Sequence, residues 1–328
     1  MTNQRLLSVF IFFTFAIWGV DYDCVVVGSS PFSLFEALYQ SHSGNRVLIL
    51  EKEERCGGAW KGISVCGIPY ADLGCHQIGQ DLKLKTFLEI YAGCKIVSLD
   101  NPKESFSKET SGLYFSRGCY ELIDHLLKLI SKTDIVLLTR TRVENISIDR
   151  NCEEATVQTK EGSYTTRKII LTPMSQLSVS GANEPSLYPT SKYYHLYLLI
   201  QDPTPPRFHY RSKVDKGASR MMNLTPFVDL EGTGRQLIVI QMTDGSHLAR
   251  GSDFLEMMQK QSLIDAGAYI LESETYIYEA GSFHCGVISK VGAERVIEVL
   301  QTGHFQQLTT YIPKWEKVLK PYSEFFTN

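Results

Sequence analysis

Apolar runs separated by short polar breaks predict a β-α-β unit near the start of the chain. The run Cys24–Val27 is continuous and rich in β-branched residues, which is typical of a buried parallel strand. Apolar residues then recur at helical spacing over 31–42, and a Ser-Gly-Asn break at 43–45 ends the predicted helix. A second apolar run, Val47–Leu50, predicts another buried strand, which Glu51 follows directly.

The same patterns predict further elements along the chain. Helical spacing indicates helices over 82–92, 120–131, 253–266 and 293–301. Strands are expected over 135–138, 155–159 and 162–165, and over 167–173, where the strand ends in a turn. Three segments with Pro- and Gly-rich turns between them, 193–200, 207–211 and 236–241, indicate a second, mainly antiparallel sheet.

These elements predict an α/β protein with two domains. A Rossmann-like domain with a parallel sheet is expected over 20–100 and 112–180. A smaller, mainly antiparallel substrate-type domain is expected over 190–300, followed by a C-terminal segment at 301–328.

The turn after the first strand has features of a dinucleotide site. Gly28, Ser30 and Ser33 occupy the positions of the glycines in the G-x-G-x-x-G fingerprint. A helix that begins at such a turn directs amide groups and the positive end of its dipole at one point, which suits a pyrophosphate. Glu51 has the position of the acid that binds a ribose hydroxyl, and a carboxylate there favours FAD or NAD over NADP.

Two serines make this fingerprint incomplete. Ser33 is still small enough for close packing of helix and strand, but Ser30 replaces the glycine that lets the backbone approach the pyrophosphate. Ser30 also suits an N-cap, and Pro31 suits the first helical position. The motif alone therefore leaves two interpretations open, a nucleotide site and a vacant β-α-β unit.

The residues after Glu51 extend the pattern. Gly57-Gly58-Ala59-Trp60 follows it closely, and Asp72-Leu73-Gly74-Cys75-His76 comes next. In order and spacing, these motifs resemble the FAD-binding start of the amine-oxidase-like flavoproteins, the group that includes UDP-galactopyranose mutase. Glu53 and Ala59 depart from the family pattern, which often has Arg at the first position and Arg or Asn at the second.

The resemblance implies that the first domain is a Rossmann-like FAD/NAD(P)-binding domain, and it implies which residues would contact the cofactor. FAD would be bound by Gly28, Ser29, Ser30, Pro31, Phe32, Ser33, Glu51, Lys52, Gly57, Gly58, Ala59 and Trp60, and the backbone of Val143 would contact the adenine. His76 would lie beside the flavin ring as the candidate catalytic residue; the alternative is a structural histidine that binds a backbone group. Trp60 suits a core position as well as a ring contact.

The resemblance also implies a function, an FAD-dependent oxidoreduction of an unknown small molecule, with NAD the less favoured cofactor. One alternative is a non-catalytic relative that binds a nucleotide or a protein through a degenerate site. Another is a mutase-like isomerase of a sugar nucleotide. After a proline such as Pro313, family members carry a further segment that covers the flavin; none is recognisable here, so a partner chain that completes the site is a further expectation.

Composition excludes some functions and adds a targeting prediction. A net charge of −3 gives no basic surface for nucleic acid, and the eight cysteines include no C-x-x-C spacing for a metal, so no metal site is expected. Arg5 followed by an uncharged apolar run at 6–18 has the form of a secretory signal or N-terminal anchor within 1–19. We therefore expect an exported or membrane-associated protein, with a cytoplasmic one as the alternative; if it is exported, Cys56, Cys66 or Cys75 could form disulfides.

Overall fold

The computed structural model describes most of the chain from Val20 to Gly281. The described residues are 20–76, 85–86, 88–89, 93–98, 113–148, 154–171, 178–180, 190–212, 214, 217–242 and 251–281. The predicted signal or anchor at 1–19, the helix at 293–301 and the segment 301–328 lie outside them. Of the predicted helix 82–92, the four described residues are helical.

The first β-α-β unit folds as the sequence predicts. Strand β1 (Cys24–Val27), helix α1 (Pro31–His42) and strand β2 (Val47–Leu50) follow one another. The two strands belong to a four-stranded sheet of order β11-β1-β2-β7, completed by β11 (Ile169–Leu171) and β7 (Val136–Leu138), and every pairing in it is parallel.

Both faces of this parallel sheet are covered, which explains its uninterrupted apolar strands. On one face, Val26 and Ile49 belong to a core that also contains side chains of α1 and of α3 (Tyr120–Ile130). On the other face, Val25 and Leu48 pack in a cluster with residues of a second sheet. That sheet has the order β10-β9-β8-β12, with β8 (Val143–Ile148), β9 (Ala155–Thr159), β10 (Ser163–Thr166) and β12 (Ser178–Ser180).

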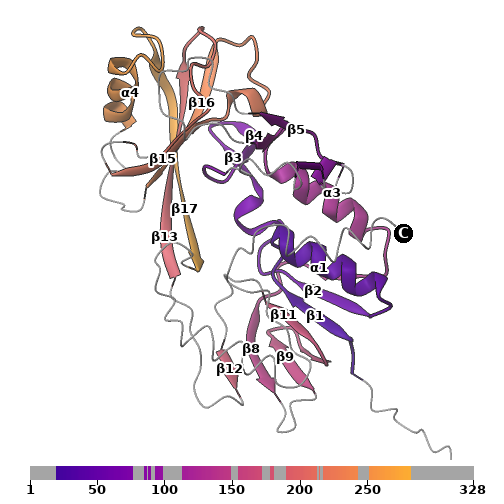
Figure 1. Ribbon diagram of the computed structural model, residues 1–328. Helices are drawn as coiled ribbons and strands as arrows, with labels where there is room; N and C mark the ends of the chain where they lie inside the picture. Colours follow the sequence, from indigo (N-terminus) through magenta and orange to yellow (C-terminus); the bar gives the residue numbers. More distant parts are fainter. Residues whose placement is uncertain are drawn as a thin grey trace, which may run out of the picture.

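A separate five-stranded antiparallel sheet has the order β14-β15-β16-β13-β17. Its strands are β13 (Thr190–Gln201), β14 (Tyr210–Ser212), β15 (Ala218–Asn223), β16 (Arg235–Met242) and β17 (Tyr269–Gly281), with a short 3-10 turn, η2 (Thr225–Phe227), before β16. Helix α4 (Gly251–Lys260) packs on its outer face through Phe254 and Met258. The long strands β13 and β17 extend from this sheet toward the parallel sheet (Figure 1).

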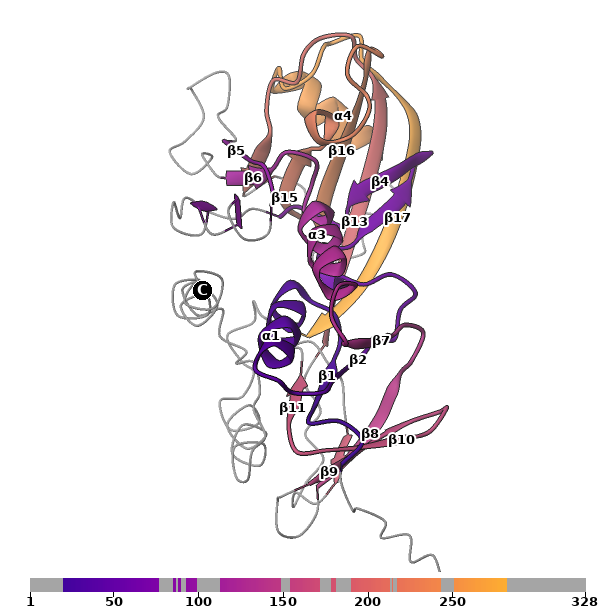
Figure 2. The same ribbon diagram turned by 90° about the vertical axis from the view of Figure 1, so that its right-hand side faces the viewer.

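The inner face of the antiparallel sheet joins the core of the first unit. Tyr197 and Val239 belong to the same apolar cluster as Phe35 of α1 and Leu122 of α3. Two small hairpins contribute side chains to the same cluster: β3 (Gly62–Val65) with β4 (Ile68–Asp72), and β5 (Ile96–Ser98) with β6 (Leu113–Phe115). Figure 2 shows β4 and α3 beside the long strands of the sheet.

The predicted fold class is confirmed, with corrections to single elements. The strand expected at 207–211 begins only at Tyr210, after a Pro-rich stretch. The helix expected to reach residue 266 ends at Lys260, because the chain turns at Ser262, which has a φ of 54°. Strands β5, β6, β12, β15 and β17 and the β3–β4 hairpin were not anticipated. Among the described residues, no helix combines the length and the apolar character needed to cross a membrane.

Candidate cofactor and substrate site

The turn after β1 brings the predicted site residues to the carboxyl edge of the parallel sheet. Gly28 has a φ of 89°, a left-handed conformation that favours glycine, and its amide donates to the carbonyl of Leu50 at 2.8 Å. This bond fixes the turn to the end of β2, where Glu51 follows. In open α/β sheets, ligands bind outside the carboxyl ends of the strands.

Helix α1 satisfies much of its own amino terminus. Ser30 is the N-cap, and its Oγ accepts a hydrogen bond from the Ser33 amide at 3.3 Å and lies 2.9 Å from the Ser33 hydroxyl. Pro31, at the first helical position, has no amide hydrogen. The predicted N-cap is therefore confirmed, and two positions at the helix start offer no free amide to a bound phosphate.

Glu51 is buried in a hydrogen-bond network of three segments. The Ser29 hydroxyl donates to Glu51 Oε2 at 2.5 Å, and the Glu53 amide donates to Oε1 at 2.8 Å. Ser29 Oγ in turn accepts from the Gly57 amide at 3.0 Å. Glu51 is only 5% exposed, but each carboxylate oxygen can accept a second bond, so the group retains capacity for ribose hydroxyls.

The paired glycines have different roles. Gly57 has a φ of 118°, and a Cβ there would lie 3.0 Å from both Ile123 Cγ1 and the Lys61 amide nitrogen, so only glycine fits. Gly58, which opens the short turn η1 (Gly58–Trp60), has a φ of 57°, and a Cβ added to it would have the Tyr278 hydroxyl, at 3.9 Å, as its nearest neighbour. Space therefore remains beside Gly58, as a cofactor passing the backbone needs.

Tyr278 brings β17 to this network, which the sequence patterns did not predict. Burial, together with the negative charges of Glu51 and Glu53, raises the pKa of its hydroxyl. The hydroxyl therefore keeps its proton and can donate a hydrogen bond. No spacing in the sequence relates residue 278 to residue 51, since the link depends on the length and direction of β17.

The Asp72–His76 segment is held by its own side chains. Asp72 Oδ2 accepts from the Cys119 amide at 2.8 Å and thus caps the start of α3. Gly74 has a φ of 95°, and its amide donates to the Tyr197 hydroxyl at 2.9 Å, while that hydroxyl donates to the Asp72 carbonyl at 2.7 Å. The motif thus connects α3 to β13.

His76 is fixed through one ring nitrogen. Its Nε2 lies 2.9 Å from the Ala59 carbonyl and 2.8 Å from the Leu73 carbonyl. Because carbonyl oxygens only accept, Nε2 carries the proton, and Nδ1 is left with an acceptor lone pair. Burial lowers the pKa of the ring, which therefore remains neutral near pH 7. The structural role considered from the sequence is thus present, and Nδ1 is the acceptor atom of the neutral ring.

The other four predicted site residues lie in different surroundings. The Trp60 ring lies 5.7 Å from the His76 ring, so these two residues are brought together. Val143 is buried in the cluster that contains Val27 and Leu50. Lys52 is exposed and lies 4.0 Å from Glu53 Oε1. The side chain of Phe32 lies outside the described part of the structure.

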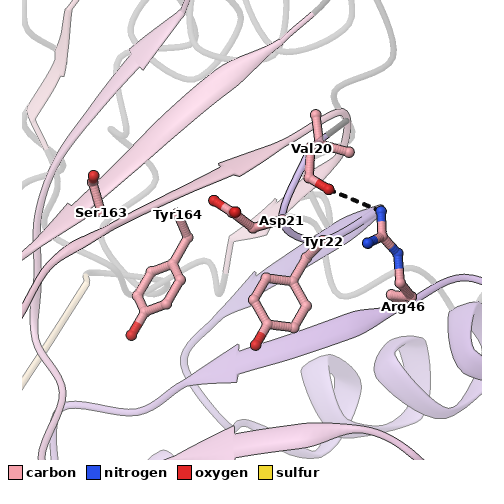
Figure 3. Close-up of a pocket in the computed structure, with 6 residues that line it drawn as sticks. All are labelled: Val20, Asp21, Tyr22, Arg46, Ser163 and Tyr164. Carbon is pink, nitrogen blue, oxygen red and sulfur yellow. Dashed lines mark hydrogen bonds between the residues drawn. The ribbon is translucent and has the colours of Figure 1, made fainter. Parts of the chain in front are cut away.

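A pocket of about 490 Å³ lies at the opposite edge of the parallel sheet. It is lined by Val20, Asp21, Tyr22, Arg46, Ser163 and Tyr164, and Arg46 donates to the Val20 carbonyl at 2.9 Å (Figure 3). These residues precede β1 and β2 or belong to β10, so the pocket is at the amino ends of the strands. It is therefore separate from the candidate cofactor site.

No disulfide joins the cysteines in the described part of the chain. Cys24, Cys56, Cys66, Cys75, Cys94 and Cys119 are all buried thiols, so the disulfides considered for Cys56, Cys66 and Cys75 are not formed among these residues. Ligand atoms of Cys66, Glu272 and Glu274 lie within 4.8 Å of one another. Burial and the two carboxylates raise the pKa of the Cys66 thiol to about 12, and Glu274 already accepts from the Cys66 amide, so the group holds the β3–β4 turn.

Comparison with solved structures identifies the class of fold. A reduced UDP-galactopyranose mutase superposes with a TM-score of 0.65 over 87% of this chain and 89% of its own, at 10% identity. A putative protoporphyrinogen oxidase from Exiguobacterium sp. 255-15 gives 0.60 over 93% and 98%, at 9% identity. Putrescine oxidase bound to putrescine gives 0.60 over 87% and 93%, at 11% identity.

The chain therefore has the fold of FAD-dependent amine-oxidase-like flavoproteins, as the sequence motifs indicated. At these identities the likeness shows the fold alone. No family model and no curated protein matches the sequence.

The residues at the carboxyl edge fit the adenosine half of FAD. Glu51 offers a carboxylate with unused lone pairs, Gly28 provides the tight turn, and Gly58 leaves open space beside the backbone. The start of α1 fits the diphosphate less well, because Ser30 and Pro31 reduce the number of free amides there.

Proposed function

We propose that this protein binds FAD at the carboxyl edge of its parallel sheet and acts as a flavin-dependent oxidoreductase on a small molecule. The observation that carries the proposal is the position of Glu51. Its buried carboxylate lies at the end of β2, joined through Ser29 to the glycine turn and to Gly57. This is the arrangement in which an acid binds the adenosine ribose.

The residues have separate roles in this proposal. Glu51 would accept hydrogen bonds from the ribose, and the turn at Gly28 would lie against the diphosphate. Gly57 and Gly58 would let the chain pass close to the cofactor. Trp60 and His76 would lie on the flavin side.

A bound FAD would supply the redox chemistry, as an acceptor for a pair of electrons from the substrate. The protein's own contribution is to position the reactants and move protons. His76, neutral and oriented through Nε2, could accept a proton at Nδ1. The raised pKa of Tyr278 makes it a hydrogen-bond donor on the ribose side.

A second candidate, a non-catalytic relative with a weak or vacant site, is favoured by one observation. Ser30 caps its own helix and Pro31 lacks an amide, so the helix start is already largely satisfied without a phosphate. This arrangement weakens the usual reason for a diphosphate to bind at that point.

The cofactor content of protein purified without added flavin separates the two candidates. A yellow preparation that releases FAD on denaturation supports the oxidoreductase. A colourless protein that is not stabilised by added FAD supports the vacant fold, since a ligand at 100 times its Kd should add about 2.7 kcal/mol to the free energy of unfolding.

A further inference from the structure

The inner face of the antiparallel sheet carries a row of polar residues opposite His76. Arg220 of β15 pairs with Gln241 of β16, Gln241 pairs with His195 of β13, and His195 pairs with Tyr276 of β17. Residues directly opposite each other point to the same face of a sheet, so these four side chains form one row across four strands. We call Arg220, Gln241, His195 and Tyr276 the polar row.

The polar row faces the Asp72–His76 segment. A Cβ on Gly74 would lie 2.7 Å from His195 Nε2, so the imidazole packs directly on that glycine. Two residues along β13, Tyr197 points the same way and bonds the Gly74 amide. The row therefore borders the same region as His76 and Trp60, where the flavin side of the cofactor is proposed to lie.

His195 has an unused hydrogen-bonding atom. The residue is 4% exposed, its ring interacts with the Gln241 side chain through a hydrogen bond, and its Nδ1 has no partner among the described residues. Burial lowers the pKa of the ring to about 3, so the ring is neutral and keeps one donor and one acceptor nitrogen. A buried polar atom left without a bond is costly, and a bound ligand would satisfy it.

Arg220 is the charged residue of the polar row, and Glu274, two residues before Tyr276 on the same face of β17, already accepts a hydrogen bond from the Cys66 amide. Arg220 is half-buried, and no carboxylate in the described part of the chain pairs with it, while its charge acts on His76 and Cys75. Lys61 is 8% exposed, and its Nζ lies 6.0 Å from the centre of the Tyr276 ring. The row itself contains no carboxylate. An anion therefore suits this face better than an amine cation.

We propose that the polar row binds the carboxylate of a small organic acid, with Arg220 as the charged partner and Gln241 and His195 as neutral ones. The guanidinium fork matches the two oxygens of a planar carboxylate. A phosphate carries more oxygens and more negative charge than a carboxylate. One arginine and two neutral side chains would leave part of that charge without a partner. The idea that this acid is the substrate depends on the proposed function. The anion site itself does not require flavin.

The test is a titration of the full-length protein with sodium propionate at constant ionic strength. The readout is the NMR signal of the His195 ring, assigned with His195→Gln, and sodium phosphate is titrated in parallel. We expect saturable shifts with propionate. Arg220→Gln should raise the dissociation constant at least about 10-fold. Arg235→Gln, on the same sheet at the first residue of β16, should leave it unchanged.

Several results would overturn the inference. These are the absence of a saturable shift in the wild type, an unchanged constant in folded Arg220→Gln, or phosphate binding as tight as propionate binding. If Arg220→Gln does not fold, Arg220→Lys retains the charge without the fork and should still weaken binding several-fold.

The flavin content of the same sample separates this inference from the proposed function. Propionate binding to a colourless protein would support the anion site and contradict the flavin proposal. A yellow protein that does not bind propionate would support the flavin proposal and contradict the anion site.

Discussion

The hydroxyl of Ser29 donates a hydrogen bond to the carboxylate of Glu51 at 2.5 Å, and both side chains are buried. These residues follow two neighbouring parallel strands, so the bond joins the ends of β1 and β2. Because Ser29 Oγ also accepts from the Gly57 amide, a single hydroxyl links the glycine turn, the acid and the paired glycines. The residues of the candidate cofactor site are therefore held in place by bonds within the protein itself.

Replacing Ser29 should destabilise the protein through this network. Ser29→Ala leaves the Gly57 amide without its acceptor and removes one donor from the Glu51 carboxylate. We expect the free energy of unfolding to fall by about 1–3 kcal/mol in urea denaturation. Ser43→Ala, which removes an exposed hydroxyl at the end of α1, is the control and should change it by less than about 0.5 kcal/mol. Equal effects of the two variants would contradict the role of the network.

Restoring the fingerprint glycine should improve cofactor binding. Ser30→Gly removes a side chain at the point where backbone must approach a diphosphate, and glycine at an N-cap costs only a few tenths of a kcal/mol. We expect FAD to bind several-fold more tightly, measured by fluorescence titration. Ser30→Ala, which lacks the cap, should instead lose about 1 kcal/mol of stability. An affinity of Ser30→Gly at or below that of the wild type would show that Ser30 does not limit the site.

Tyr197 holds the Asp72–His76 segment to the antiparallel sheet. Tyr197→Phe leaves the Gly74 amide and the Asp72 carbonyl without their partner, in a place with no exposed surface. The expected loss is about 1–3 kcal/mol in the free energy of unfolding. Tyr210→Phe, on the same face of the sheet, is the matched control, with an expected change of less than about 0.5 kcal/mol. A Tyr197→Phe protein as stable as this control would refute the assignment.

Asp72 should make stability depend on pH. Burial raises its pKa from 3.8 to about 7, even though it caps α3. The native state therefore binds this proton more tightly than the unfolded state, and the wild type loses stability as the pH rises from about 4 to about 7. The Asp72→Asn variant has no carboxyl group at this position, so its free energy of unfolding should not show this decrease with pH.

The comparison is made by urea denaturation between about pH 5 and about pH 8. The free energy of unfolding of the wild type, relative to Asp72→Asn, should fall across this window. A difference that stays constant or grows with pH would mean that the α3 amides outweigh burial and hold the carboxylate charged.

Local patterns predicted the first β-α-β unit well, and physical reasons explain why. Its strands are buried on both faces, so they appear as uninterrupted apolar runs, and the N-cap Ser30 with Pro31 defines the helix start. Strand β17 was missed because much of it is exposed and polar, with Glu272 and Glu274 within it. Its position depends on pairing with β13, which no local pattern encodes.

The candidate site was predicted in part for the same reason. Ser29, Glu51 and Gly57 follow a recognisable spacing, and the structure joins them in one network. His195 and Tyr278 belong to strands that reach the site only through the sheet register. Their contribution depends on contacts between segments more than 100 residues apart, which one sequence without relatives does not reveal.

The FAD affinity of Glu51 variants tests the central claim most directly. Calorimetric titration of the flavin-free protein with FAD should give a saturable isotherm for the wild type. Glu51→Ala should weaken binding by about 10-fold or more, since a hydrogen bond to a charged group is lost, and His76→Ala should weaken it less. If the wild type binds no FAD, or if folded Glu51→Ala binds it as tightly as the wild type, the carboxyl edge of this sheet is not an FAD site.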